Sequence, residues 1–124
     1  SFIEKLFGGR FDKLPAGIIH VTEENFKQTV LDSPVVSALN FWMADHEPSW
    51  LLLPEFLDIT AKFKGKVQFG ISNFDQSRDL ATQFRVSHVP TMVFFKKSEA
   101  VDRLTGIQSR YAVEKILRSL VEEQ

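Results

Sequence analysis

The chain has 124 residues, of which 44% are hydrophobic and 25% are charged, and its formal net charge at pH 7 is −1. This length suits one domain with its own core, and the near-zero charge argues against a nucleic-acid or anionic-membrane surface. No apolar run is long enough to span a bilayer, and the absence of cysteine excludes disulfides, thiolate catalysis and cysteine metal sites. We favour a cytoplasmic location, although the lack of cysteine does not by itself indicate a compartment.

Residues 1–17 are predicted to form an extension that precedes the main domain. Four apolar side chains share one face of a short amphipathic helix: Phe2, Ile3, Leu6 and Phe7. This helix, followed by a linker, either packs on the domain or docks onto a partner, and it is one of two candidate homodimer contacts. The chain begins at Ser1 rather than Met, which fits the removal of a leader, an anchor or a neighbouring domain.

From residue 18 onwards, strand and helix patterns alternate. Strands are expected at residues 18–21, 35–41, 67–72, 92–95 and 100–104, and helices are expected after Thr22, from Pro48, after residue 76 and after Ser109. Repeated strand–helix–strand units predict a parallel centre, and a final hairpin adds antiparallel strands. The predicted domain, residues 18–124, is an α/β fold. It has a central mixed sheet of four to five strands flanked by helices, and the extra N-terminal helix precedes it.

The stretch from residue 35 to residue 54 organises this pattern. It reads as a buried strand, a sharp turn and a helix that opens at Pro48. A strand that leads into a helix N-terminus gathers unpaired backbone N–H groups and partial positive charge at one place. The side chains expected there are His46, Glu47 and Ser49, which are therefore the first candidates for function.

Several short sequences are spread along the chain from residue 18 onwards: Ile18-Ile-His-Val-Thr, Phe41-Trp42, Pro48, Pro54, Gly65-Lys66, Asp75-Gln76, Val89-Pro90-Thr91 and Gly106. They stand at the spacing found in thioredoxins, and from residue 18 to the C-terminus the chain resembles that family. The resemblance implies a thioredoxin-like fold. The N-terminal extension falls largely outside it.

The active-site motif is where the chain departs from the family. The motif places His46 and Ser49 at the two cysteine positions and keeps only Pro48, while the family's buried aspartate and its lysine partner fall on Asn40 and Ile71. Disulfide exchange needs a thiolate, and a hydroxyl is a poor nucleophile towards sulfur. We therefore expect no redox activity, no catalytic residue and no cofactor. The alternative is a thiol-disulfide oxidoreductase by homology whose cysteine was replaced or mutated, for example by engineering at Ser49.

Pro90 resembles the family's cis-proline, which lies opposite the active-site turn. The resemblance implies that the Val89 backbone pairs there with an extended peptide, beside a loop at Gly106 and Ile107. The expected apolar groove is completed by four further residues: Trp42, Pro48, Trp50 and His88. Since such a groove needs no cysteine, a protein or extended-peptide partner is expected. The other interpretation is that Pro90 only shapes the fold.

Other combinations of these residues point to weaker hypotheses. His46, Glu47 and His88 could meet at a divalent metal, but nothing in the sequence fixes their directions, and we predict no metal site. His46 and Ser49 resemble a base–nucleophile pair without an identifiable orienting acid, so we do not expect a hydrolase.

The favoured function is a redox-inactive, protein-binding or chaperone-like module that uses the former substrate groove. Trp50 is either an interface anchor, and then the second candidate homodimer contact, or a residue packed on the N-terminal helix. Self-association through Phe2, Phe7 and Trp50 is a third interpretation.

Overall fold

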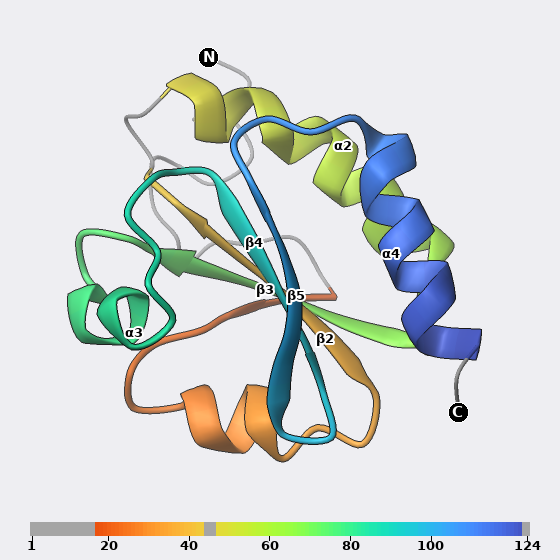
Figure 1. Cartoon of the computed structure of the whole chain (residues 1–124), viewed down its shortest axis with the longest axis horizontal. Helices are drawn as coiled ribbons and strands as arrows, with labels where there is room; N and C mark the ends of the chain where they lie inside the picture. Colours follow the sequence, from red (N-terminus) through yellow and green to blue (C-terminus); the bar gives the residue numbers. More distant parts are fainter. Residues whose placement is uncertain (1–16, 44–46, 123–124) are drawn as a thin grey trace.

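The computed structural model describes residues 17–43 and 47–122, with backbone alone at residues 47–53. These residues form a mixed five-stranded sheet with helices on both faces (Figure 1). Within these described ranges, no helix combines the length and the apolar character that crossing a membrane requires.

The sheet has the strand order β1-β3-β2-β4-β5. Its strands are β1 (Ile18–His20), β2 (Val36–Trp42), β3 (Val67–Asn73), β4 (Thr91–Lys96) and β5 (Glu99–Thr105). The first three strands are parallel, β4 runs antiparallel to β2, and β5 runs antiparallel to β4. This arrangement confirms the predicted α/β fold with a mixed central sheet.

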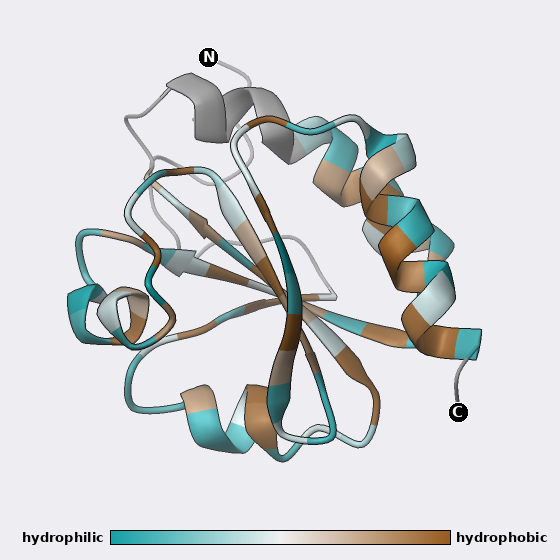
Figure 2. Cartoon of the chain, viewed as in Figure 1, coloured by the Kyte–Doolittle hydropathy of each residue, from teal (hydrophilic) through white to brown (hydrophobic). Residues whose placement is uncertain are grey.

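Among the described residues, four helices cover the sheet: η2 (Lys27–Leu31), α2 (Glu47–Lys62), α3 (Arg78–Gln83) and α4 (Arg110–Glu122). Figure 1 shows α2 and α4 side by side on one face, whereas η2 and α3 lie on the other. Figure 2 shows hydrophobic and hydrophilic residues interspersed along α4, and its buried Val113 and Leu117 are four residues apart, as on one face of an amphipathic helix. The Ser109 hydroxyl accepts a hydrogen bond from the Ala112 N–H (3.2 Å), so the expected cap of α4 is present.

The segment that follows Thr22 is less regular than expected. Thr22 Oγ1 accepts a hydrogen bond from the Asn25 N–H (3.2 Å), and Asn25 Oδ1 accepts one from the Thr22 N–H (2.8 Å). These reciprocal bonds form the expected cap at Thr22, but the residues that they enclose make a turn rather than a helix. The helical segment η2 begins only at Lys27. Its Asp32 N–H bonds to Lys27 O (2.9 Å), five residues back, which makes η2 a wide π-type turn.

Two apolar clusters, one on each face of the sheet, hold these layers together. The cluster under α2 and α4 includes Phe56, Phe69 and Phe94. The cluster under η2 and α3 includes Phe26 and Phe95, whose ring centroids lie 5.6 Å apart. Aromatic side chains therefore pack in the core on both faces of the sheet.

β5 forms one edge of the described sheet, and its outer side is protected against pairing with another strand. The Gly106 N–H donates a hydrogen bond to Pro90 O (2.7 Å), so these two residues form a hydrogen-bonded pair of the antiparallel ladder. Hydrogen-bonded and non-hydrogen-bonded pairs alternate along the ladder, and Arg103 belongs to a non-hydrogen-bonded pair, so its backbone N–H and C=O point away from β4. The Asp102 carboxylate accepts a hydrogen bond from this Arg103 N–H (2.7 Å), and a register shift interrupts the strand. Both features disfavour self-association by strand addition at β5.

Glu114 links the two helices of the same face. Its side chain is only 9% exposed, and its carboxylate lies 3.2 Å from Lys62 Nζ of α2 and 3.4 Å from Arg110 Nε. The hydrogen bond from Lys62 lowers the pKa of Glu114, burial opposes this, and the positive charges of Lys62 and Arg110 leave the pKa below its ordinary value.

Replacing Glu114 with glutamine should lower the melting temperature near neutral pH and lose this effect in acid. The folded state binds a proton at Glu114 less tightly than the unfolded chain does. The ionised carboxylate therefore stabilises the fold above the unfolded pKa, and this contribution is lost as the pH falls through the folded pKa. Thermal unfolding of both proteins between about pH 3 and about pH 7 tests this. A difference in melting temperature that stays constant with pH would contradict it.

Candidate functional site

Three segments meet at one end of the sheet: the end of β2, the start of β4 and the end of β5. Thr91, the first residue of β4, pairs with Phe41 of β2 and with Thr105 of β5. The next helix along the chain from β2 is α2, and Figure 1 shows the start of α2 and the loop into α4 at this same end. The residues expected to bind a partner belong to these segments.

The loop before β4 is held in a defined shape. The peptide bond between Val89 and Pro90 is cis, and Pro90 is buried. The Thr91 hydroxyl donates to His88 O (2.6 Å), and the Gly106 N–H donates to Pro90 O (2.7 Å). These two bonds occupy the carbonyl groups on either side of Val89.

The backbone of Val89 is left available between these bonds. Neither its N–H nor its C=O has a hydrogen-bond partner among the described residues, while its half-buried side chain packs on the cluster under η2 and α3. Nearby, Ile107 is 52% exposed, and Gly106 has φ +82°, with no described atom other than those of its chain neighbours within 4 Å of the place where a Cβ would stand. A free backbone donor and acceptor beside an exposed apolar side chain can receive an extended segment.

His88 lies on the solvent side of this loop. Its side chain is exposed, and its Nδ1 is 3.0 Å from the Ser87 hydroxyl. Ser87 was not among the expected site residues, although its position next to a histidine was a signal for it. In the part of the chain that the structure describes, no three metal-ligating side chains gather, so His88 has no partners there for the metal hypothesis.

Asn40 is a buried polar residue in the middle of β2. It is 0% exposed, and neither atom of its amide group has a hydrogen-bond partner among the described residues. It is paired in register with Ile71 of β3 and Met92 of β4, both of which are buried and apolar. A neutral amide between two apolar neighbours cannot take up or release a proton near neutral pH.

One residue expected on the binding surface lies elsewhere. Trp42 is 1% exposed and belongs to the same core cluster as Phe56. Alternate residues of β2 face the layer formed by α2 and α4, and this layer covers Trp42 from solvent. The expectation that Trp42 lines a groove is therefore wrong.

Other expected residues lie partly or wholly outside the described structure. His46 is outside it, as are the residues of the N-terminal extension that were candidates for a homodimer contact. Glu47, Pro48, Ser49 and Trp50 form the first turn of α2, where only the backbone is described. The described part of the expected surface thus comprises His88, Val89, Pro90, Gly106 and Ile107.

The comparisons with known proteins agree on one family. The thioredoxin family model matches residues 17–119. Thioredoxin 1 of Nostoc sp. is 33% identical over 86 residues, which are 69% of this chain and 80% of that protein. The thioredoxin of Rickettsia felis is 30% identical over 91 residues, which are 73% of this chain and 87% of that protein. Together with the mixed sheet, these matches show that the chain belongs to the thioredoxin family, of which it is a member without cysteine.

Proposed function

We propose that this chain is a redox-inactive thioredoxin-like domain that binds an extended segment of a partner protein, in a docking or chaperone-like role. The observation that carries the proposal is the free Val89 backbone beside the exposed Ile107 side chain. An extended peptide could exchange hydrogen bonds with Val89 and cover Ile107, and neither contact requires sulfur.

The chemical content of the site supports the non-redox part of the proposal. The chain contains no cysteine, so it has no thiolate to attack a disulfide. The buried Asn40 has an amide group where the family resemblance places a carboxyl that assists proton transfer, and its neighbour Ile71 is apolar. What remains at this end of the sheet is a surface suited to binding.

Binding to an unfolded protein without free thiols tests the proposal. Reduced α-lactalbumin whose cysteines are blocked with iodoacetamide is a suitable probe, because alkylation removes disulfide chemistry and adds no charge. We expect measurable binding by fluorescence anisotropy. We expect replacement of Ile107 with aspartate to weaken it about tenfold or more, because a charge would replace buried apolar contact.

Val101→Asp is the matched control. Val101 is 44% exposed on the edge strand β5, so the same change is made at a similarly exposed apolar side chain outside the proposed surface. Its binding should stay close to that of the parent chain. Equal weakening by both variants, or turnover of insulin disulfides by the parent chain, would refute the proposal, and such turnover would favour the oxidoreductase alternative.

A further inference from the structure

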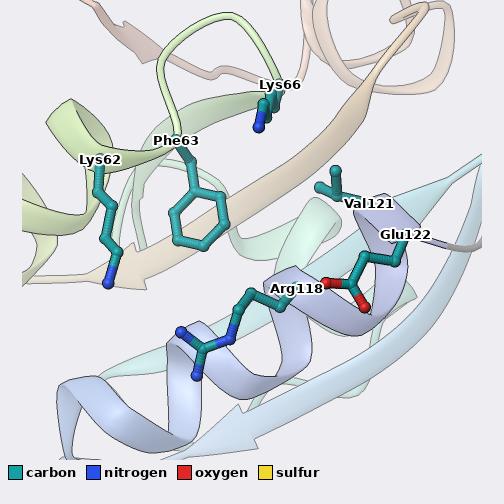
Figure 3. A pocket seen from close by; sticks show the side chains of 6 residues that line it. All are labelled: Lys62, Phe63, Lys66, Arg118, Val121 and Glu122. Atoms are coloured by element: carbon teal, nitrogen blue, oxygen red, sulfur yellow. The ribbon is translucent and has the colours of Figure 1, made fainter.

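A second surface lies at the opposite end of the sheet from Val89. It is a pocket of about 260 Å³ between the C-terminal ends of α2 and α4 (Figure 3). Six residues line it: Lys62, Phe63, Lys66, Arg118, Val121 and Glu122. Because Lys66 directly precedes β3, the pocket adjoins the end of the sheet where β2 and β3 begin.

The positively charged side chains at this pocket outnumber the described carboxylates that pair with them. Lys62 Nζ is 3.2 Å and Arg118 Nη1 is 3.9 Å from the same Glu114 oxygen, while Arg110 binds the other oxygen. One nearly buried carboxylate is thus shared by three cations. Lys66 makes no ion pair with any described residue, and the side chains of Lys62 and Arg118 are 50% and 45% exposed.

Two features oppose this charge without cancelling it. Glu122 lines the pocket but lies within ion-pair distance of no described cation. The carbonyl ends of α2 and α4 add partial negative charge. At α4 one of these carbonyls, Leu120 O, already accepts a hydrogen bond from Lys96 Nζ (2.8 Å), which also brings a further cation near the end of that helix.

The pocket also has an apolar side. Phe63 is 6% exposed, and the half-buried Val121 packs against the core cluster under α2 and α4. Figure 3 shows the Phe63 ring between the side chains of Lys62 and Lys66, with Arg118 across the pocket on α4. The volume is below the roughly 300–1,000 Å³ of pockets that enclose drug-sized molecules. It suits an acidic side chain together with an apolar neighbour.

From this combination we infer that the pocket binds an acidic segment of a partner protein, with a glutamate or aspartate between Lys66 and Arg118 and an apolar side chain against Phe63. The guanidinium of Arg118 can hold a carboxylate through two hydrogen bonds, and Lys66 supplies a cation that pairs with no described carboxylate. This surface is separate from the Val89 surface, and the inference does not depend on it.

A short labelled peptide in which glutamate alternates with leucine tests the inference, with its glutamine counterpart as the uncharged probe. We expect the glutamate peptide to bind and the glutamine peptide to bind about tenfold more weakly or not at all. Binding should also weaken as sodium chloride is raised, because the partly exposed charges become screened.

Comparing charge reversal at two nearby lysines distinguishes binding in the pocket from general electrostatic attraction to the protein. Lys66→Glu should weaken binding of the glutamate peptide about tenfold or more. Lys64→Glu changes the net charge equally, but Lys64 is exposed and does not line the pocket, so binding should change less than about twofold. Thermal unfolding of both variants verifies the fold, and Lys66→Ala provides a milder second variant.

Three outcomes would overturn the inference. The first is equal binding of the glutamine peptide, and the second is equal weakening by the two charge reversals. The third is tighter binding of a single-stranded oligonucleotide than of the glutamate peptide, with the same loss on Lys66→Glu, which would assign the pocket to nucleic acid.

Discussion

Replacing Phe95 with alanine should lower the free energy of unfolding by about 3–5 kcal/mol, the range found when a buried phenylalanine is truncated. Phe95 lies on β4 and is 1% exposed. Its ring centroid is 5.6 Å from that of Phe26 and 5.2 Å from that of Phe84. The change would therefore remove the common neighbour of two aromatic rings and leave a cavity between the sheet and the layer of η2 and α3.

Chemical denaturation in urea measures this change. Tyr111→Ala is the control, because Tyr111 is 68% exposed and its removal should alter the free energy of unfolding by less than about 0.5 kcal/mol. A decrease in the free energy of unfolding below about 1.5 kcal/mol for Phe95→Ala would contradict the prediction. It would mean that neighbouring side chains move into the space of the missing ring and leave a smaller cavity.

The same cluster supports the proposed binding surface. Phe84 follows α3 directly, and its carbonyl and that of Arg85 accept hydrogen bonds from the Arg103 guanidinium of β5. The chain then runs through Val86, which is buried in this cluster, to the loop at Val89. A variant that loosens the cluster should therefore also weaken binding at Val89, whereas Val101→Asp should not.

Much of the fold followed from local patterns in the sequence. The run of apolar and β-branched residues before residue 42 predicted a strand covered on both faces, and all seven residues of β2 are buried. The apolar spacing after Ser109 predicted an amphipathic helix, and Val113 and Leu117 of α4 are buried in the core. Such patterns are set by neighbours within a turn or two of the chain, which is why they can be read without the structure.

The parts that could not be predicted depend on residues far apart in the sequence. Trp42 was expected to line the groove because local sequence does not reveal that it packs into the core cluster under α2 and α4. Nothing in the local sequence marks Lys62 or Lys66 as part of a binding pocket, and only the packing of α4 against α2 brings Arg118 to them. The bond between Asp102 and the Arg103 N–H depends on which strand lies at the edge of the sheet.

Replacing Asn40 with leucine should raise the free energy of unfolding by about 1–3 kcal/mol, which is what burial of an unpaired amide costs in proteins. Asn40 is 0% exposed, and in the described part of the chain its amide has no hydrogen-bond partner. Leucine has the same number of side-chain heavy atoms as asparagine and branches at the same carbon, and its apolar side chain suits the neighbouring Ile71 and Met92. Urea denaturation at neutral pH measures the gain, and an unchanged or lower stability would contradict the prediction.

Asn40→Asp is the informative counterpart. It would place a carboxyl between two apolar neighbours with no described cation beside it, so it should be destabilising at neutral pH, where burial of the charge is most costly. If the leucine variant gains stability and still binds alkylated α-lactalbumin like the parent chain, the amide serves neither the fold nor the Val89 surface. That pair of results would mean that binding at this end of the sheet is independent of the buried position where the family resemblance places a proton-transfer group.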